Sequence, residues 1–523
     1  MASSTPKPLF PDGIDDLVAS VQSQYSIPSQ CIGIVDGTRT ATRAYGLAQL
    51  PNTPATEDTL YYIASCTKSF TATTLQCLLG NLKGTVSLQT TLASVLPADD
   101  FALAESTYAT ERATLEDALA HRLGTARHDL SYGGRADYTV ADAVRSLRHL
   151  TPAVAFREKH HYLNLGYMTV QHAIETLAGG EGIEALHERY IWAPLGMRTT
   201  FISLATAREA AASRMAEGYT RDAAEPETVI VAPYVDDYPL VGGGGIISSI
   251  ADMTRYMAAV VHNGFPTLSS EAYEDLFVPR VVAGDSPHKA WSTQLYALGW
   301  KVATFHGHRI VHHDGGICGF AAKMLFLPAQ RWGVVVLANS DAGGSAGNET
   351  VLLRLLRERL GLGEGEEGAE IFAGWEKEFA EILQRAKTAR ERLYPPASRP
   401  TTPLSLPLDA YEGAYSNAGY GLMHVRRTRA TDNVPCRSKI ASILHAEWPG
   451  RLMDFVFDFE HVGGEEFVVW VDTATSSAMV RSGQRGRFVV RDGRVKMLGV
   501  NLSPFEERTD DENLMVWFSR VVE

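Results

Sequence analysis

Apolar and polar positions along the chain repeat with two periods, and each period predicts a different element. Apolar residues spaced three and four apart are typical of helices, and they predict helices over residues 13–24, 115–123, 142–150, 168–177, 250–262, 349–360 and 371–393. Short apolar runs bounded by turn residues are typical of strands, and they predict strands at 31–35, 298–303, 309–312, 321–327 and 333–339. The last four runs follow one another closely, so we expect successive antiparallel strands of one sheet. Helices and strands in this order indicate an α/β (α+β) fold.

The pattern changes after residue 394. Residues 394–407 are rich in Pro, Ser and Thr, which is typical of a linker. Beyond them, strand-like runs at 467–471, 486–490 and 496–500 are separated by turns and indicate a separate all-β module. We therefore divide the chain into a large domain of residues 1–394, which ends with the helix 371–393, a Pro-rich linker of residues 395–407 and a β-domain of residues 408–523.

Four consecutive glycines, at 242–245, precede the helix predicted at 250–262. They are not a phosphate-binding loop, because no Gly-Lys-Ser or Gly-Lys-Thr follows them. We expect them to allow a close approach of the backbone to a substrate or to a neighbouring strand.

Ser65 and Lys68 bring candidate chemistry to the start of a buried helix predicted at 70–79. If the helix begins at Ser65, positions three apart lie on one face, a turn apart. A serine hydroxyl becomes a nucleophile when a base takes its proton, and burial lowers the pKa of a lysine enough for it to be that base. The helix N-terminus adds free backbone N–H groups for an oxyanion. The spacing alone is a weak signal, because it also occurs on solvated helix faces.

Composition and charge exclude several classes of partner. The chain has 523 residues and is 45% hydrophobic and 21% charged, which is ordinary for a globular protein. Its formal net charge of -13 argues against nucleic acid or an anionic membrane as the main partner. No apolar run is long enough to cross a bilayer, and residues 1–16 lack the pattern of a secretory signal. Five scattered cysteines indicate free thiols in a reducing compartment, so we expect a cytoplasmic protein.

A cluster of histidines raises the question of a metal site, with members at His306, His308, His312 and His313. Their spacing differs from that of the H-x-H-x-D-H zinc motif, and alternation along a strand places His312 and His313 on opposite faces. We therefore expect neither a metal nor an organic cofactor.

Three short motifs stand in order along the chain: Ser65-Cys66-Thr67-Lys68, Tyr162-Leu163-Asn164 and His313-Asp314-Gly315. Together they resemble the S-x-x-K, Y-x-N and H-x-G pattern of the serine β-lactamase and penicillin-binding-protein superfamily. The chain looks most like its class C β-lactamases, DD-carboxypeptidases, D-aminopeptidases, esterases and lovastatin-type acyltransferases. The likeness extends over about residues 13–360, and residues 408–425 resemble the lipocalin-like module often attached to these proteins.

The resemblance implies a fold and a set of roles. It implies a β-lactamase/transpeptidase-like fold, with helices packed on an antiparallel sheet and an all-α insertion, followed by a small lipocalin-like β-domain. Ser65 would form an acyl-enzyme, with Lys68 and Tyr162 as its acid–base pair. Asn164, His313, Gly315 and Gly316 would bind the substrate: Asn164 at the acyl amide, Gly315 by leaving room along the strand, and Gly316 through its N–H, which would join that of Ser65 around the oxyanion.

His313 stands where other members of the superfamily carry the lysine of K-T-G. A histidine carries less positive charge at neutral pH than a lysine. Asp314 should point to the other face of the strand and leave this proton unsupported. The H-x-G form therefore favours neutral esters, amides or thioesters over penicillins.

We thus expect a serine hydrolase that cleaves an ester, amide or thioester of a small-molecule acyl substrate. Two alternatives remain open: an acyltransferase or thioesterase of secondary metabolism with the same acyl-enzyme, and a catalytically silent binding protein. The complete set of Ser65, Lys68, Tyr162 and Asn164 argues against the silent protein. The sequence leaves the oligomeric state open, a homo-oligomer included.

Overall fold

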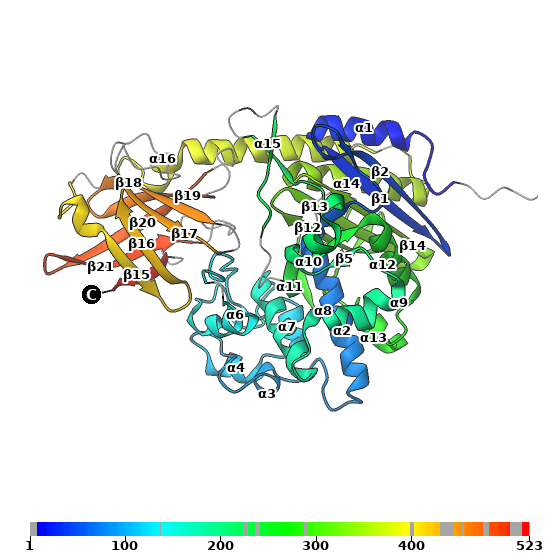
Figure 1. Ribbon diagram of the computed structural model, residues 1–523, viewed down its shortest axis with the longest axis horizontal. Helices are drawn as coiled ribbons and strands as arrows, with labels where there is room; N and C mark the ends of the chain where they lie inside the picture. The colour runs from blue at the N-terminus through cyan, green and yellow to red at the C-terminus, as the bar shows by residue number, and fades with distance from the viewer. Residues whose placement is uncertain are drawn as a thin grey trace, which may run out of the picture.

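A computed structural model of the chain describes residues 8–135, 137–222, 225, 228–235, 241–285, 290–363, 365–397, 402–428, 443–451, 454–473, 481–502 and 515–521. It has two parts side by side, an α/β part and a β-barrel (Figure 1). The predicted arrangement, with helices on an antiparallel sheet followed by a small all-β domain, is confirmed.

A large antiparallel sheet forms the centre of the α/β part. Its strand order is β3-β2-β1-β14-β13-β12-β11-β10-β9, and the four successive strands expected from the sequence are β11 to β14. The strands span Ser29–Asp36 (β1), Arg39–Gln49 (β2), Thr53–Pro54 (β3), Val281–Gly284 (β9), Gln294–Tyr296 (β10), Lys301–Phe305 (β11), His308–Ile317 (β12), Phe320–Leu327 (β13) and Trp332–Ala338 (β14).

Helices cover both faces of this sheet, which explains why a central strand such as β14 is apolar and buried along its whole length. Side chains alternate across a strand, and in β14 Val334 and Val336 face one apolar cluster while Val335 and Leu337 face the other. The first cluster includes side chains of α1 (Ile14–Tyr25), α14 (Ala342–Leu360) and α15 (Glu367–Lys387). The second includes side chains of α2 (Thr67–Asn81) and α12 (Ile250–His262).

The predicted all-α insertion lies between β4 (Leu60–Tyr62) and β5 (Thr200–Phe201), where the described residues form no strand. Its helices are α2, α3 (Leu92–Val95), α4 (Thr107–Arg112), α5 (Leu115–Leu119), α6 (Val140–Ser146), α7 (Asn164–Leu177), α8 (Ile183–His187) and α9 (Ala193–Leu195). The remaining short elements of this part are α10 (Leu204–Ala211), α11 (Val241–Gly244), α13 (Ser270–Asp275), β6 (Tyr219–Arg221), β7 (Val229–Val231) and β8 (Ile247–Ser249).

The C-terminal module is a closed eight-stranded antiparallel barrel, in which β22 pairs back onto β15. Its strands are β15 (Gly413–Asn417), β16 (Gly421–Arg427), β17 (Leu444–Trp448), β18 (Phe455–Gly463), β19 (Glu466–Thr473), β20 (Ser482–Arg491), β21 (Arg494–Asn501) and β22 (Met515–Arg520). Closure removes the free strand edges that an open sheet exposes.

The helix predicted at 371–393 is wrong in one respect, because it is two helices. α15 ends at Lys387 and α16 covers Ala389–Leu393. α15 packs on the sheet part, where Phe372 and Trp375 contact the ring of Tyr25. α16 instead packs on the barrel (Figure 1).

Several other predicted bounds also shift. The helix predicted at 70–79 begins at Thr67, and the helix predicted at 349–360 begins at Ala342. The strand predicted at 309–312 continues to Ile317, so the His313–Gly316 segment lies within β12. Of the predicted linker, residues 398–401 lie outside the described residues, as does Cys436. The other four cysteines are free thiols.

No helix within the described ranges is long and apolar enough to span a membrane.

Candidate active site

Ser65 lies at the junction of β4 and α2. It is the middle residue of a 3₁₀ turn, Ala64–Cys66, so the α-helix starts two residues after it rather than at it. Ala64 has φ 45°, a left-handed conformation that costs energy for a residue with a Cβ. The Ser65 Oγ lies 3.1 Å from Lys68 Nζ and 2.8 Å from the hydroxyl of Tyr162. The two predicted acid–base groups therefore meet at the hydroxyl oxygen of Ser65.

Lys68 is fully buried at 0% exposure. Its Nζ lies 2.8 Å from Asn164 Oδ1 and 2.6 Å from the carbonyl oxygen of Gly243. Burial holds the pKa of Lys68 well below its usual value, and the nearby positive charge of Arg127 lowers it further. The lowered pKa favours the uncharged amine, which is the form of a lysine that can accept a proton.

The four glycines bring this carbonyl to the lysine. Residues 241–244 form the helical turn α11, which packs on α7, and a Cβ on Gly242 would lie 2.8 Å from Gln171 Cβ. The Gly242 N–H donates to Gln171 Oε1 at 2.9 Å. The close approach expected from the sequence is thus made to a helix, and its result is a hydrogen-bond acceptor for Lys68.

His121 holds the segment that carries Tyr162 and Asn164. Its carbonyl oxygen accepts from the His161 N–H at 2.9 Å, and its Nδ1 accepts from the Leu163 N–H at 3.0 Å. The imidazole must be neutral to accept there, and burial keeps the pKa of His121 well below its usual value. Its ring lies 4.3 Å from the Tyr162 ring, which packs the phenol against it.

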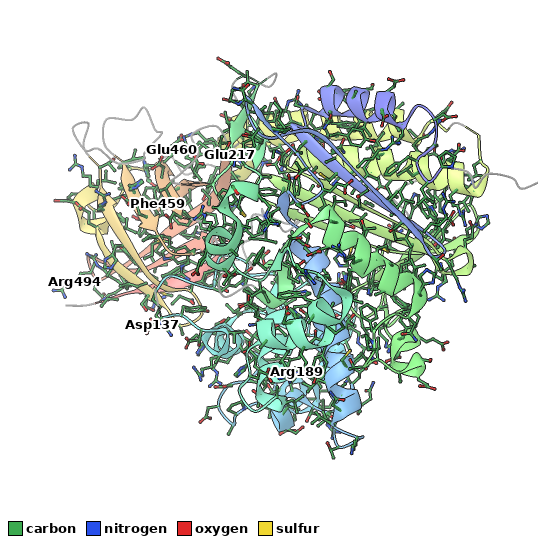
Figure 2. The ribbon with its side chains drawn as sticks, turned by 45° about the vertical axis from the view of Figure 1, so that its right-hand side comes forward. Asp137, Arg189, Glu217, Phe459, Glu460 and Arg494 are labelled. Carbon is green, nitrogen blue, oxygen red and sulfur yellow. The ribbon has the colours of Figure 1, made fainter. Side chains whose placement is uncertain are left out.

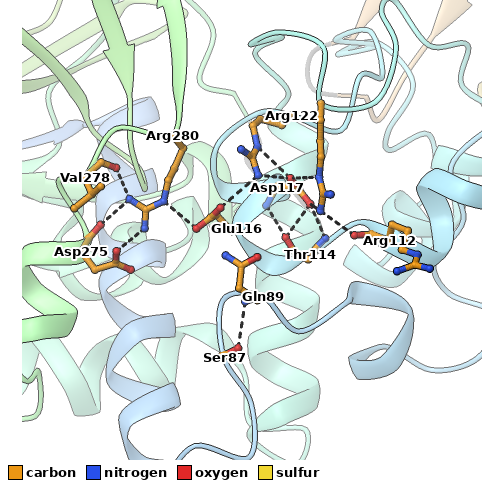
Figure 3. A network of polar contacts seen from close by, with 11 residues as sticks. Ser87, Gln89, Arg112, Thr114, Glu116, Asp117, Arg122, Asp275, Val278 and Arg280 are labelled. Carbon is orange, nitrogen blue, oxygen red and sulfur yellow. Dashed lines mark hydrogen bonds and ion pairs between the residues drawn. The ribbon is translucent and has the colours of Figure 1, made fainter.

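An ion-pair network surrounds two acidic residues of α5, Glu116 and Asp117 (Figure 3). The buried carboxylate of Asp117 pairs with Arg122 and Arg157, each at 2.6 Å. Arg280 pairs with Glu116 at 2.9 Å and connects α5 to the chain before β9. Arg157 precedes Tyr162 by five residues, so this network fixes the start of the chain segment that enters the site.

Asp129 and Arg127 complete the surroundings of Lys68. Asp129 Oδ1 accepts from Asn164 Nδ2 at 3.1 Å, which turns the oxygen of the Asn164 amide toward Lys68. Arg127 pairs with Asp129 at 2.7 Å, and its guanidinium lies 5.4 Å from the centre of the Tyr162 ring. Burial raises the pKa of the Tyr162 hydroxyl, so this group stays protonated at neutral pH.

His313 is buried on β12, and both ring nitrogens have partners. Nδ1 donates to the carbonyl oxygen of Asp314 at 2.7 Å, which leaves Nε2 to accept from the Tyr296 hydroxyl at 3.0 Å. Burial lowers the pKa of His313 to about 3, so its ring is neutral at pH 7. The Asp314 side chain is turned to Lys301, at 2.8 Å, as expected from strand alternation.

The two glycines of β12 differ in what surrounds them. A Cβ on Gly315 would lie 2.1 Å from the carbonyl oxygen of Ile63 and 3.1 Å from the Ser65 nitrogen. Gly315 therefore lets the strand pack against the turn that carries Ser65, a role that differs from the expected one of leaving room for substrate. A Cβ on Gly316 would meet nothing within 4 Å. Pairing of β11 with β12 ends at His312, so this stretch of the β12 edge has no partner from β11.

Known proteins resemble this chain over most of its length. The family model described as Beta-lactamase matches residues 14–358. The chain belongs to the β-lactamase family. An unguisins hydrolase of Aspergillus campestris is 30% identical over 498 residues, which cover 94% of this chain and 89% of that one. A D-aminopeptidase of Cereibacter sphaeroides is 24% identical, over 68% of this chain and 65% of its own length. This family member is a serine hydrolase of the β-lactamase type.

Solved structures share the fold at low sequence identity. The octameric penicillin-binding protein homologue from Pyrococcus abyssi has a TM-score of 0.58 and 18% identity, and the match covers 97% of this chain and 99% of that chain. The D-amino acid amidase from Ochrobactrum anthropi has a TM-score of 0.54 and 20% identity, over 66% of this chain and 98% of its own. The match with the Pyrococcus abyssi structure covers 97% of this β-lactamase-family chain and therefore includes its barrel.

Several residues at the site carry no motif of their own. Gly243 acts through a backbone carbonyl, which has no side-chain signature. Asp129 and Tyr296 contact the site only because distant segments fold together. His121 reaches Leu163 through a hydrogen bond between segments 42 residues apart in the chain, which no local sequence pattern reveals. In the part of the chain that the structure describes, no group of three or more His, Cys, Asp or Glu side chains is arranged to hold a metal.

Proposed function

We propose that Ser65 is the nucleophile of an acyl-enzyme mechanism that hydrolyses an ester, amide or thioester bond in a small molecule. The observation that carries the proposal is the surroundings of Lys68. An uncharged amine has two N–H bonds and one lone pair. Its two carbonyl acceptors, Asn164 Oδ1 and the Gly243 oxygen, take the N–H bonds. The lone pair is then left for the Ser65 hydroxyl at 3.1 Å.

The proton inventory follows from this arrangement. Lys68 takes the Ser65 proton as Oγ bonds to the substrate carbonyl carbon. Tyr162, which donates to Oγ at 2.8 Å, gives its proton to the leaving group and then takes one from the ammonium of Lys68. In deacylation the same groups take a proton from water and return it to Oγ. We assign the oxyanion to the N–H groups of Ser65 and Gly316.

We propose a neutral acyl donor as the substrate. His313 is uncharged and its nitrogens are both engaged, so it offers no fixed charge for a substrate carboxylate. Relatives named for unguisins hydrolysis, D-aminopeptidase and D-amino acid amidase activity favour an amide among the three bond types. Asn164 supports this choice, because beyond its bonds to Lys68 and Asp129 its amide retains one N–H and one oxygen lone pair, which suit a peptide-like group.

Ser65→Ala tests the assignment. The variant should lose labelling by a fluorophosphonate, seen by intact mass, and lower turnover by about 10⁴-fold or more. Ser69→Ala is the matched control, since Ser69 lies on the same helix and donates to the Cys66 carbonyl oxygen, away from Lys68. Label on Ser65→Ala at the wild-type rate would refute the proposal. A screen of p-nitrophenyl esters, D-amino-acid amides and nitrocefin identifies the bond, and added alcohol reveals acyl transfer.

Assembly and location are further parts of the proposal. The octameric relative from Pyrococcus abyssi supports a homo-oligomer, which light scattering on the purified chain measures directly. A cytoplasmic location stays a prediction, and microscopy of the tagged chain in its own cell would test it.

A further inference from the structure

The loop of residues 127–134 faces the candidate site on one side and the barrel on the other. On the site side, Asp129 binds Asn164 at 3.1 Å, and the Tyr132 hydroxyl donates to the same Asp129 oxygen at 3.0 Å. Asp129 is 4% exposed, so its contacts are made inside the protein. The orientation of the Asn164 amide therefore depends on where this loop lies.

On the other side, two residues of the barrel bind the loop directly. Arg451 donates from Nη1 to the Ser131 carbonyl oxygen at 2.7 Å and from Nη2 to the Tyr420 carbonyl oxygen at 2.6 Å. The Tyr420 hydroxyl lies 2.7 Å from His128 Nδ1. The two contacts with the loop, from Arg451 to Ser131 and from Tyr420 to His128, join positions 320 and 292 residues apart in the chain.

Arg451 is a buried arginine whose hydrogen bonds go to main-chain oxygens. Arg451 is 7% exposed, and among the described residues no carboxylate forms an ion pair with it. Its guanidinium lies 4.4 Å from the Trp448 ring. Because removing an arginine from water without an acidic partner is costly, its hydrogen bonds to main-chain oxygens must offset that cost. A buried arginine of this kind holds its partners in a fixed geometry.

The loop itself is shaped to accept the barrel. Gly133 and Gly134 have φ of 94° and 91°, conformations that favour glycine. A Cβ on Gly133 would lie 2.5 Å from the Gly450 carbonyl oxygen, and one on Gly134 would lie 2.8 Å from the Arg451 guanidinium. The Gly134 N–H donates to the Gly450 oxygen at 2.6 Å. Figure 1 shows the all-α insertion beside the barrel. Figure 2 labels Asp137, which follows this loop in the chain and lies beside the barrel.

We propose that Arg451 and Tyr420 are positioning residues of the active site: they clamp the 127–134 loop, so that Asp129 holds the Asn164 amide with its oxygen toward Lys68. The inference rests on the proposed role of Lys68. If the loop moves, Asn164 Nδ2 loses its acceptor and the amide is free to turn its N–H₂ group toward the lysine. Lys68 then loses one of the two acceptors that direct its lone pair to Ser65.

The test compares barrel arginines that make the same number of main-chain hydrogen bonds. Arg451→Met keeps much of the side-chain packing and removes both donors. Arg520→Met is the control, because Arg520 donates to the carbonyl oxygens of Ala410 and Glu412 within the barrel, at 2.7 and 2.6 Å. We expect Arg451→Met to lower kcat for an amide or ester by about 10-fold to 100-fold, with a smaller change in KM. Arg520→Met should keep kcat within about 2-fold of the wild-type value. The two variants are compared at a temperature at which both are fully folded.

A pH profile separates positioning from general weakening of the fold. The 127–134 loop carries both Arg127, which lowers the pKa of Lys68, and Asp129, which raises it, so displacement of the loop should move the acid limb of kcat/KM in Arg451→Met, whereas Arg520→Met should leave it in place. Asp129→Asn, which removes only the charge that raises the pKa, should move the limb to lower pH. The double variant should be no worse than Asp129→Asn alone, because Arg451 acts through Asp129. Arg451→Lys, which retains one donor, should fall between Arg451→Met and wild type.

An unchanged kcat and acid limb in folded Arg451→Met would overturn the inference, as would additive losses in the double variant. If Arg451→Met does not fold, Tyr420→Phe decides in the same way, with Tyr415→Phe as its control, since the Tyr415 hydroxyl donates to Tyr411 within the barrel. Failure of the proposed function is a separate result, because it appears as labelling of Ser65→Ala and not as a change in the arginine variants.

Discussion

At the scale of the residue, the site depends on groups whose charge is set by burial. Lys68 and His313 have lowered pKa values, whereas Tyr162 has a raised one, and burial is the largest cause in each case. His313 and Tyr162 are therefore uncharged at pH 7, and burial shifts Lys68 toward its uncharged form. A neutral Lys68 would take up the Ser65 proton, and the two carbonyl oxygens beside it would then accept from the ammonium that forms.

The acid limb of catalysis should move in opposite directions when the two charges near Lys68 are removed. The rate should rise with pH as Lys68 loses its proton. Arg127 lowers the pKa of Lys68 and Asp129 raises it. Arg127→Gln should therefore shift the midpoint of kcat/KM to higher pH, and Asp129→Asn to lower pH, each by about 0.5 to 1 pH unit. Shifts of the same sign in both variants would show that Lys68 is not the titrating base.

Substrate charge preference should follow position 313. His313→Lys would place an ammonium on β12 beside the turn that carries Ser65, so turnover of carboxylate-bearing β-lactams should improve relative to that of neutral esters. His308→Lys is the control, because His308 lies on the same strand but is exposed at its far end. The measurement is the ratio of kcat/KM for nitrocefin and a p-nitrophenyl ester. An unchanged ratio in His313→Lys would mean that another cation, such as Arg127, already governs this preference.

At the scale of the element, the distance between β12 and the turn of Ser65 is set by a missing side chain. Gly315→Ala would bring a Cβ against the Ile63 carbonyl oxygen, at 2.1 Å before any movement. We expect it to lower the free energy of unfolding by about 1–3 kcal/mol and to reduce labelling of Ser65. Gly316→Ala meets nothing within 4 Å, so its thermal stability should match that of wild type. Equal melting temperatures for the two variants would contradict this reading.

The sequence predicts best those elements and residues whose information is local. The runs that became β11 to β14 were recognisable because turn residues separate them, and Ser65 and Lys68 because their spacing is fixed by a helix. The break between α15 and α16 was missed, since apolar residues continue at helical spacing through Thr388. The contacts of Asp129 and Gly243 were also missed, because they depend on packing between segments far apart in the chain.

At the scale of the molecule, the two parts share packed surface as well as a covalent connection. An apolar cluster continues from the insertion into the barrel, with members that include Leu147, Leu150, Tyr420, Trp448 and Phe518. α16 also belongs to the barrel by its contacts. Leu393 packs against Val462 and Val468, and Arg390 pairs with Glu460 at 2.6 Å, on the strand where Phe459 is buried inside the barrel (Figure 2). We therefore propose that the boundary predicted after residue 394 lies at Thr388 instead.

Two truncations of equal size, each from a six-carbon aliphatic residue to alanine, should locate this boundary in the intact chain. Ile371 of α15 packs in the cluster under the large sheet, and Leu393 of α16 packs in the barrel cluster. Each substitution by alanine should lower local stability by about 2–5 kcal/mol. Because amide exchange reports local opening, Leu393→Ala should speed exchange in β19 and β20 and leave β1 and β14 unchanged, whereas Ile371→Ala should do the reverse. Faster exchange in β1 and β14 of Leu393→Ala would instead place α16 with the sheet, and the boundary after residue 394 would stand.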